Sequence, residues 1–109
     1  MTLFLRPWEP VCGDRAKYFE KELARELAPH HPLFGRPVHA IALTVESDDV
    51  LYQLDDGSVS QVHLTYTPNA PEAASGCPRH RSYGMFGDWV IEKMLPDHID
   101  HFGLWNECW

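Results

Sequence analysis

Three apolar runs between Pro37 and Thr67, separated by two short acidic turns, form the clearest pattern in the chain. The runs are rich in Val, Ile, Leu, Tyr and Thr, which favour strands, whereas SDD and DDG contain residues that tolerate turn dihedrals. The pattern therefore predicts a three-stranded antiparallel meander, in which the Asp-Gly turn is typical of a hairpin.

Side chains alternate between the two faces of such a sheet. In the first strand, alternation places Ile41 and Leu43 on one face and Ala40 and Ala42 on the other. The first face is large and apolar across the strands, while the second face is small or polar and includes Gln53, Gln61, His63 and Thr65. A polar face of this kind is either a recognition surface or the solvent side of the sheet.

Two helices are expected to accompany the sheet. Apolar residues at spacings of three and four predict a helix that begins with a cap at Gly13 or Asp14 and ends before Pro29. Its apolar stripe, which we expect on the large apolar face, consists of Ala16, Phe19, Leu23 and Leu27. A shorter helix is predicted from Asp88 to Leu95, where Pro96 would end it.

The remaining segments are less regular. Thr2 to Trp8 is expected to be an extended arm or a short edge strand, which would make the sheet four-stranded. Asn69 to Ser82 is rich in Pro, Ala, Ser and Gly and is predicted to be one long loop. We expect its cationic run, Arg79, His80 and Arg81, to dock on the acidic sheet, to bind an anion or simply to lie in solvent.

These elements predict a single α+β domain over residues 1–109. The composition is typical of a soluble globular protein, since 44% of the residues are hydrophobic and 23% are charged. The first ten residues lack the continuous apolar stretch of a signal peptide, and no run is long enough to cross a membrane. Three cysteines without a C-x-x-C pair do not suggest a disulfide framework. The expected compartment is the cytoplasm.

The charge is unevenly placed. The net charge is −7, and residues 37–78 contain six acidic side chains and no Lys or Arg. Because nucleic acid binding needs a positive surface, a DNA or RNA partner is not expected. A basic protein partner fits the field, although acidity also serves solubility. The candidate binding residues are Asp48, Asp49, Asp55 and Asp56 on this reasoning, and Gln53, Gln61, His63 and Thr65 as members of the polar face.

Aromatic residues mark the C-terminal tail, in which Trp105 and Trp109 are further binding candidates. A tail with two tryptophans is expected to dock, either on its own sheet or on a second molecule. The second case predicts a homo-oligomer and gives one alternative function, that of an oligomerising structural protein.

Few sequence motifs in the chain indicate a catalytic activity, a cofactor or a metal. The chain has no P-loop, dinucleotide-binding or serine-hydrolase motif, so no cofactor is expected. His98 and His101, three residues apart, are weak candidates for metal ligands, but no set of three or four ligands has the spacing of a metal site. A small hydrolase that uses His63, His98 and His101, with or without a metal, is the alternative from the enzyme class.

Several stretches resemble a small family of uncharacterised bacterial proteins. The chain contains HPLFG, SDDVLYQLDDGS and VHLTY, which are similar to the H-P-L-x-G, S-D-D-V-L and V-H-L-T-[WY] motifs of that family. The resemblance covers residues 20–67 and implies a stand-alone α+β domain without assigning an activity. The size and acidity are also similar to those of immunity proteins. We therefore expect a non-enzymatic protein-binding module, such as an immunity or inhibitor protein for a basic partner.

Overall fold

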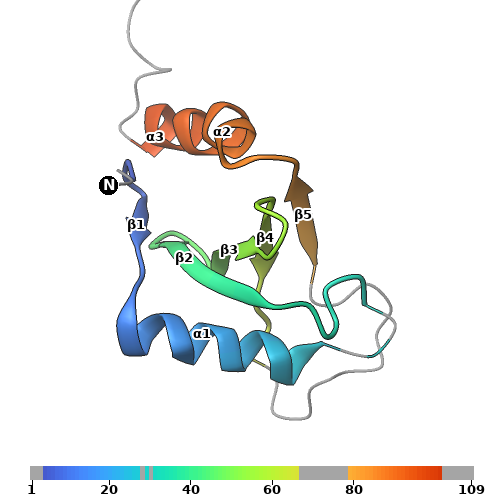
Figure 1. Ribbon diagram of the computed structural model, residues 1–109. Coiled ribbons are helices and arrows are strands. Elements are labelled where there is room, and N and C mark those ends of the chain that lie inside the picture. The colour runs from blue at the N-terminus through green and yellow to red at the C-terminus, as the bar shows by residue number, and fades with distance from the viewer. Residues whose placement is uncertain (1–3, 28, 30, 67–78, 102–109) are drawn as a thin grey trace, which may run out of the picture.

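The computed structural model describes residues 4–27, 29, 31–66 and 79–101. In this part of the chain, five antiparallel strands form one sheet in sequential order, with helices on both faces (Figure 1). The strands are β1 (Trp8–Pro10), β2 (Val38–Thr44), β3 (Asp49–Leu54), β4 (Val59–His63) and β5 (His80–Tyr83). The predicted α+β class and antiparallel sheet are confirmed, and the sheet has five strands rather than three or four.

Helix α1 (Gly13–Glu26) covers one face of the sheet (Figure 1). Its predicted apolar stripe is confirmed, since Leu23 is 1% exposed and packs in a hydrophobic cluster with β2, β3 and β4. Cys12 caps the helix with extended backbone, so the predicted cap at Gly13 or Asp14 is wrong. The cluster under α1 includes Val11, Ala16, Leu27, Leu33, Ala40, Val50, Tyr52, Leu54, Val62 and Leu64.

The opposite face lies under three consecutive helical segments, α2 (Phe86–Trp89), the π-helical η1 (Val90–Met94) and α3 (Leu95–His101) (Figure 1). A second hydrophobic cluster forms here around Trp8 and Trp89, whose rings meet edge to face at 4.9 Å. The Trp8 indole N–H also donates to Asp97 Oδ2 at 2.9 Å. These contacts tie the N-terminal edge strand to the C-terminal helix.

The predicted helix from Asp88 to Leu95 is wrong at both ends. It begins at Phe86, and the side chain of Asp88 instead accepts the Met85 backbone N–H at 3.1 Å. It also continues past Pro96. Proline normally clashes with the carbonyl four residues earlier, but here the Leu95 N–H bonds to the Val90 carbonyl, five residues back. The wider π turn accommodates the proline inside the helix.

A β-bulge in β2 overturns the predicted faces of this strand. The register shifts between Ala40, opposite Tyr52, and Ala42, opposite Leu51. Consequently Ala40 and Leu43 pack under α1, whereas Ile41 and Ala42 pack under the C-terminal helix. A bulge inserts one extra residue and so breaks the alternation on which the prediction relied.

The first three residues of strand β5 lie in the segment that was predicted to be a loop, from Asn69 to Ser82. Its sequence, HRSY, contains one large apolar side chain, Tyr83, which is buried in the second cluster. Pairing with β4 over four residues stabilises the strand. Its own sequence lacks the alternation that would have identified it.

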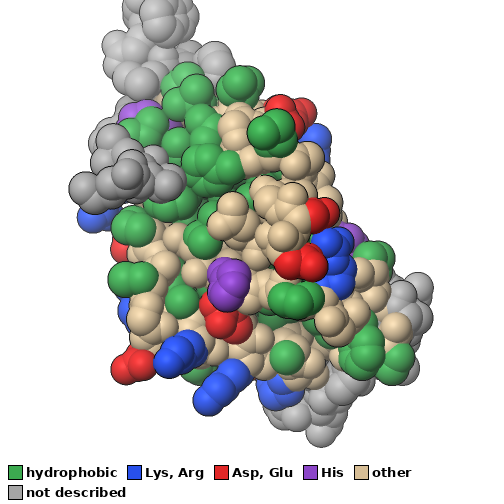
Figure 2. Space-filling view, viewed as in Figure 1, with side chains coloured by type: hydrophobic (Ala, Val, Ile, Leu, Met, Phe, Trp, Pro, Cys, Tyr) green, Lys and Arg blue, Asp and Glu red, His purple; other side chains and the backbone are tan. Residues whose placement is uncertain are grey.

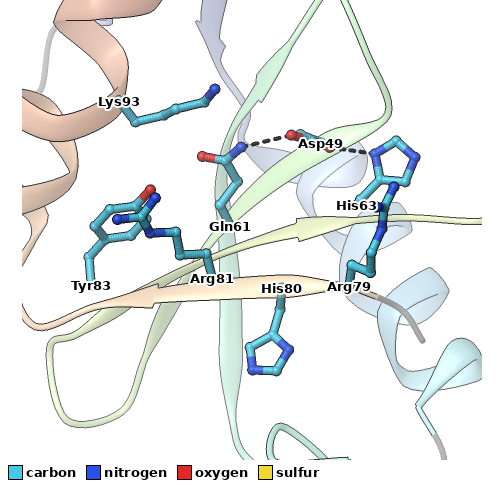
Figure 3. Close-up of a pocket in the computed structure, with 8 residues that line it drawn as sticks. All are labelled: Asp49, Gln61, His63, Arg79, His80, Arg81, Tyr83 and Lys93. Carbon is cyan, nitrogen blue, oxygen red and sulfur yellow. Dashed lines mark hydrogen bonds and ion pairs between the residues drawn. The ribbon is translucent and has the colours of Figure 1, made fainter. Parts of the chain in front are cut away.

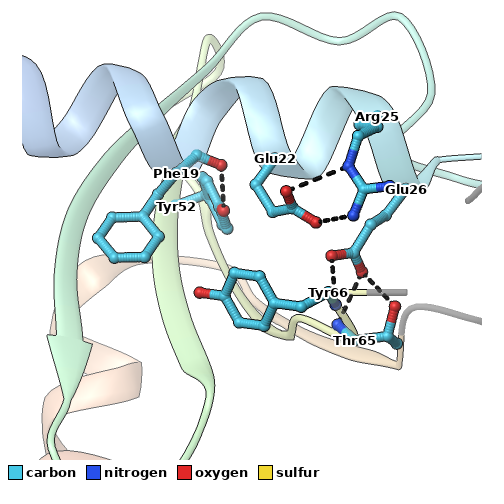
Figure 4. Close-up of polar contacts among 7 residues, drawn as sticks. All are labelled: Phe19, Glu22, Arg25, Glu26, Tyr52, Thr65 and Tyr66. Carbon is cyan, nitrogen blue, oxygen red and sulfur yellow. Dashed lines mark hydrogen bonds and ion pairs between the residues drawn. The ribbon is translucent and has the colours of Figure 1, made fainter. Parts of the chain in front are cut away.

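The chain after β4 is held by a buried carboxylate on α1. Glu26 is 3% exposed and accepts the backbone N–H groups of Thr65 and Tyr66 at 2.8 and 2.9 Å (Figure 4). The Thr65 hydroxyl donates to the same carboxylate at 2.9 Å. Glu26 therefore fixes the path of the chain as it leaves the sheet.

Candidate functional site

A pocket of about 320 Å³ opens on the face of β3, β4 and β5 that is turned towards η1 (Figure 3). We call it the β3–β5 pocket. Polar and charged side chains dominate its wall. The lining residues are Asp49, Gln61, His63, Arg79, His80, Arg81, Tyr83 and Lys93. No residue of the first hydrophobic cluster is among them.

Strand register explains why these side chains meet. Asp49 lies opposite His63 in the β3–β4 pair, and Gln61 lies opposite Arg81 in the β4–β5 pair. Residues two apart in a strand point to the same face, so Gln61 and His63 share one face of β4. By the same rule Arg81 of β5 points to the same side as Arg79, the residue before the strand, whose carbonyl accepts the His63 backbone N–H at 2.9 Å.

Asp49 connects two polar side chains of β4. One carboxylate oxygen contacts His63 Nδ1 at 2.6 Å, and the other accepts the Gln61 side-chain amide at 2.7 Å (Figure 3). Gln61 in turn accepts the indole N–H of Trp89 at 3.0 Å. Since Trp89 is fully buried, this chain of hydrogen bonds fixes the orientation of Asp49 from the core outwards.

Three cationic side chains line the pocket, namely Arg79, Arg81 and Lys93. Arg81 lies 3.9 Å from Glu92 and stacks over the Tyr83 ring with 5.2 Å to its centroid. Lys93 projects from η1 and contacts Asp97 at 3.2 Å. Within the described part of the chain, the Arg79 guanidinium has no ion pair. The wall thus presents three cations against one carboxylate, in a chain whose net charge is −7.

His80 differs from the other lining residues because its ring points away from them (Figure 3). It packs beside His31, with ring centroids 4.6 Å apart and ring planes tilted by 52°. Burial, and to a smaller extent the neighbouring His31, lowers the pKa of His80. Its ring is therefore neutral at pH 7, and we do not count it among the cations. The Tyr83 hydroxyl also stays protonated, because burial raises the pKa of Tyr83.

The pocket is equipped for anion binding and for proton transfer. Guanidinium and ammonium groups bind carboxylates and phosphates through charge-assisted hydrogen bonds. When the His63 ring is neutral, Asp49 favours the tautomer with the proton on Nδ1, which leaves Nε2 as a basic nitrogen. The side chain of His63 is 42% exposed, so Nε2 is accessible to a ligand or to water.

The structure brings three of the sequence-predicted binding residues together, namely Asp49, Gln61 and His63. Asp55 and Asp56 lie on the β3–β4 turn, within 3.2 and 3.3 Å of Arg36. Asp48 is exposed on the β2–β3 turn. These aspartates are outside the pocket, so the predicted acidic residues do not form a single site.

The other predicted residues lie apart from this group. Thr65 is bound to Glu26. Gln53 lines a groove of about 430 Å³ with Phe4, Pro10, Ile41 and Phe86. Figure 2 shows hydrophobic side chains gathered on the part of the surface where the C-terminal helix and the N-terminal segment lie. Trp105 and Trp109 are outside the described residues.

The weak metal-ligand candidates have other contacts. His98 Nδ1 lies 2.8 Å from the Arg6 carbonyl, and His101 Nδ1 lies 2.6 Å from Glu46. Among the described residues, no three His, Cys, Asp or Glu side chains converge to hold a metal ion. Within the same residues, no helix has the length and apolar character needed to cross a bilayer.

Sequence reasoning partly anticipated the pocket. The run of Arg79, His80 and Arg81 was an expected anion-binding candidate, but its position beside His63 depends on β5, which was not predicted. Lys93 and Tyr83 were missed. Lys93 follows the predicted helix start by five residues and carried no signal that it would face the sheet.

The comparisons with known proteins do not add an assignment. No protein-family model, curated protein or solved structure matches this chain.

Proposed function

We propose that the protein is a binding module whose β3–β5 pocket receives an anionic group of its ligand, such as a phosphate or a carboxylate. The observation that supports this proposal is the gathering of Arg79, Arg81 and Lys93 around one pocket. In a chain with a net charge of −7, these cations form a local concentration of positive side chains, although Arg81 and Lys93 also contact Glu92 and Asp97.

The cations approach the pocket from two directions. Arg79 and Arg81 come from β5 and the residue before it, while Lys93 comes from the helix above the sheet (Figure 3). An arginine fork matches two oxygens of a phosphate or carboxylate, and lysine adds a compact charge. An anion between the strand and the helix would contact both kinds of donor.

The ion pair between Arg81 and Glu92 at the pocket is easily exchanged. The side chains of Arg81 and Glu92 are 71% and 53% exposed and lie 3.9 Å apart. Exposed pairs of this kind contribute about 0 to 1 kcal/mol. A ligand anion can therefore replace Glu92 beside Arg81 at little cost in stability.

A titration with inorganic phosphate tests this proposal, with sodium chloride at matched ionic strength as the salt control. We expect saturable NMR shifts of the Gln61, His63 and Arg81 amides, with a dissociation constant on the order of 1 mM. The double variant Arg81→Ala, Lys93→Ala should bind at least about tenfold more weakly. Arg36→Ala, which removes a cation that lies before β2 and contacts the β3–β4 turn, serves as the matched control. Shifts that never saturate, or that the double variant leaves unchanged, contradict the proposal.

A basic protein partner, as for an immunity or inhibitor protein, remains the second candidate. The observation that favours it is the exposure of Asp55 and Asp56, whose side chains are 56% and 57% exposed despite their contact with Arg36. Electrostatic steering by such residues raises association rates and weakens with salt. Once a partner is identified, Asp48→Asn, Asp55→Asn and Asp56→Asn together should slow association. An association rate that is indifferent to both salt and these changes contradicts this candidate.

A further inference from the structure

We infer that the β3–β5 pocket hydrolyses phosphodiesters, with His63 as the general base that activates water. The inference rests on the proposed function, because the arginines that bind the anion must also hold the phosphodiester. It goes beyond that function by assigning a reaction and a substrate class to the same residues.

The arrangement around His63 meets the requirements for a positioned base. Asp49 contacts Nδ1 at 2.6 Å, which holds the ring in one orientation and leaves Nε2 to accept a proton. Gln61 and the buried Trp89 hold Asp49 in turn. A base that is oriented by a carboxylate is the arrangement that acid–base catalysis uses in unrelated folds.

The cations favour a phosphodiester over an uncharged ester. A phosphodiester carries one negative charge, and attack by water adds a second charge on the oxygens around phosphorus. Arg79, whose backbone carbonyl accepts the His63 N–H, and Arg81 line the same pocket as His63, and in this inference their guanidinium groups stabilise that added charge. Electrostatic stabilisation of developing charge is usually the largest contribution to catalysis.

The reaction consumes one water molecule. The water oxygen forms a bond to phosphorus while its proton moves to His63 Nε2, and the bond between phosphorus and the leaving oxygen breaks. Lys93 supplies a proton to that oxygen. His63 then releases its proton to solvent, and Lys93 regains one from solvent. The products are a phosphate monoester and an alcohol, and no electron transfer is involved.

The test uses the full chain with bis(p-nitrophenyl) phosphate as the probe, in the presence of EDTA to suppress contaminating metal-dependent nucleases. We expect release of p-nitrophenolate at constant pH well above the rate without protein. His63→Gln should lower the rate by about 100-fold or more. Asp49→Asn should lower the rate as well. The matched control is His39→Gln, because His39 is a histidine whose side chain is 78% exposed and lies outside the pocket.

The outcomes separate the inference from the proposed function. Saturable phosphate binding without catalysed release overturns the hydrolysis and leaves anion binding intact. Absence of both binding and release overturns both proposals. Release that is equal in wild type and His63→Gln identifies a contaminant and also overturns the inference. Folding of His63→Gln and Asp49→Asn is verified by chemical denaturation, so that a lost rate reports the pocket.

Discussion

Glu26 Oε2 accepts the backbone N–H of Tyr66 at 2.9 Å, and the backbone φ of Tyr66 is +54°, in the left-handed region. Among the described residues, Tyr66 is the one non-glycine residue with a positive φ. Bulky side chains rarely adopt this conformation, which persists where the surrounding structure enforces it. Here the buried carboxylate supplies that constraint.

Glu26→Ala should lower the free energy of unfolding by about 1 to 3 kcal/mol, because the Thr65 and Tyr66 N–H groups lose their acceptor. Glu26→Gln, which keeps one carbonyl oxygen, should cost less than Glu26→Ala. Urea denaturation of the three proteins measures both differences. Equal stability of wild type and Glu26→Ala would mean that water replaces the carboxylate as the hydrogen-bond acceptor with no change in the free energy of unfolding.

The pH dependence of stability should report the same carboxylate. Burial, together with the side chain of Glu22, raises the pKa of Glu26, although the N–H groups of Thr65 and Tyr66 oppose the shift. A carboxyl with a raised folded-state pKa contributes most below the unfolded pKa, and this contribution is lost as pH rises through the folded value. We therefore expect the stability of wild type relative to Glu26→Gln to fall as pH rises above the ordinary glutamate value of 4.5. A stability difference between wild type and Glu26→Gln that grows with pH would contradict the raised pKa of Glu26.

Leu23→Ala tests the packing of α1. Leu23 is 1% exposed within the first hydrophobic cluster, and truncation of a buried leucine costs about 2 to 5 kcal/mol. Lys21→Ala, on the exposed side of the same helix, should stay within about 0.5 kcal/mol of wild type. A loss below about 0.5 kcal/mol for Leu23→Ala in chemical denaturation would place that helix face outside the core.

The tautomer of His63 is a further test of the pocket. Because Asp49 accepts at 2.6 Å from Nδ1, the neutral ring should carry its proton on Nδ1. Long-range ¹⁵N–¹H NMR spectra distinguish the two ring nitrogens. Asp49→Asn should mix the tautomers, whereas Asp48→Asn, at the neighbouring position, should leave the spectrum unchanged. A wild-type ring protonated on Nε2 contradicts the hydrogen bond.

Regular periodicity made α1 predictable, whereas irregular backbone hid other elements. The recurrence of apolar residues at three and four positions specifies one helix face, and Leu23 and Leu27 are buried on it. The bulge at Ile41 adds one residue to β2 relative to its partner strand. The π turn before Pro96 likewise holds one residue more than an α-helical turn. Such changes leave no mark on a hydrophobic pattern, so the faces of β2 and the end of the last helix were predicted wrongly.

The Asp49–His63 pair could have been predicted from the hairpin. The β3–β4 turn is centred on Asp56, with Asp49 seven residues before it and His63 seven residues after it. In a hairpin the turn fixes the register, so residues at equal distance from its centre face one another. The position of Arg81 beside them was not predictable in this way, because β5 follows a long connection and has no apolar alternation.

The four charged side chains that line the pocket, Asp49, Arg79, Arg81 and Lys93, and the imidazole of His63 belong to neither hydrophobic cluster. Substitutions among them change the charge and chemistry of the pocket without removing a side chain from either hydrophobic cluster. Selection for a new ligand can therefore act on this surface without first requiring compensating changes inside the protein. The arrangement separates the evolution of specificity from the maintenance of the fold.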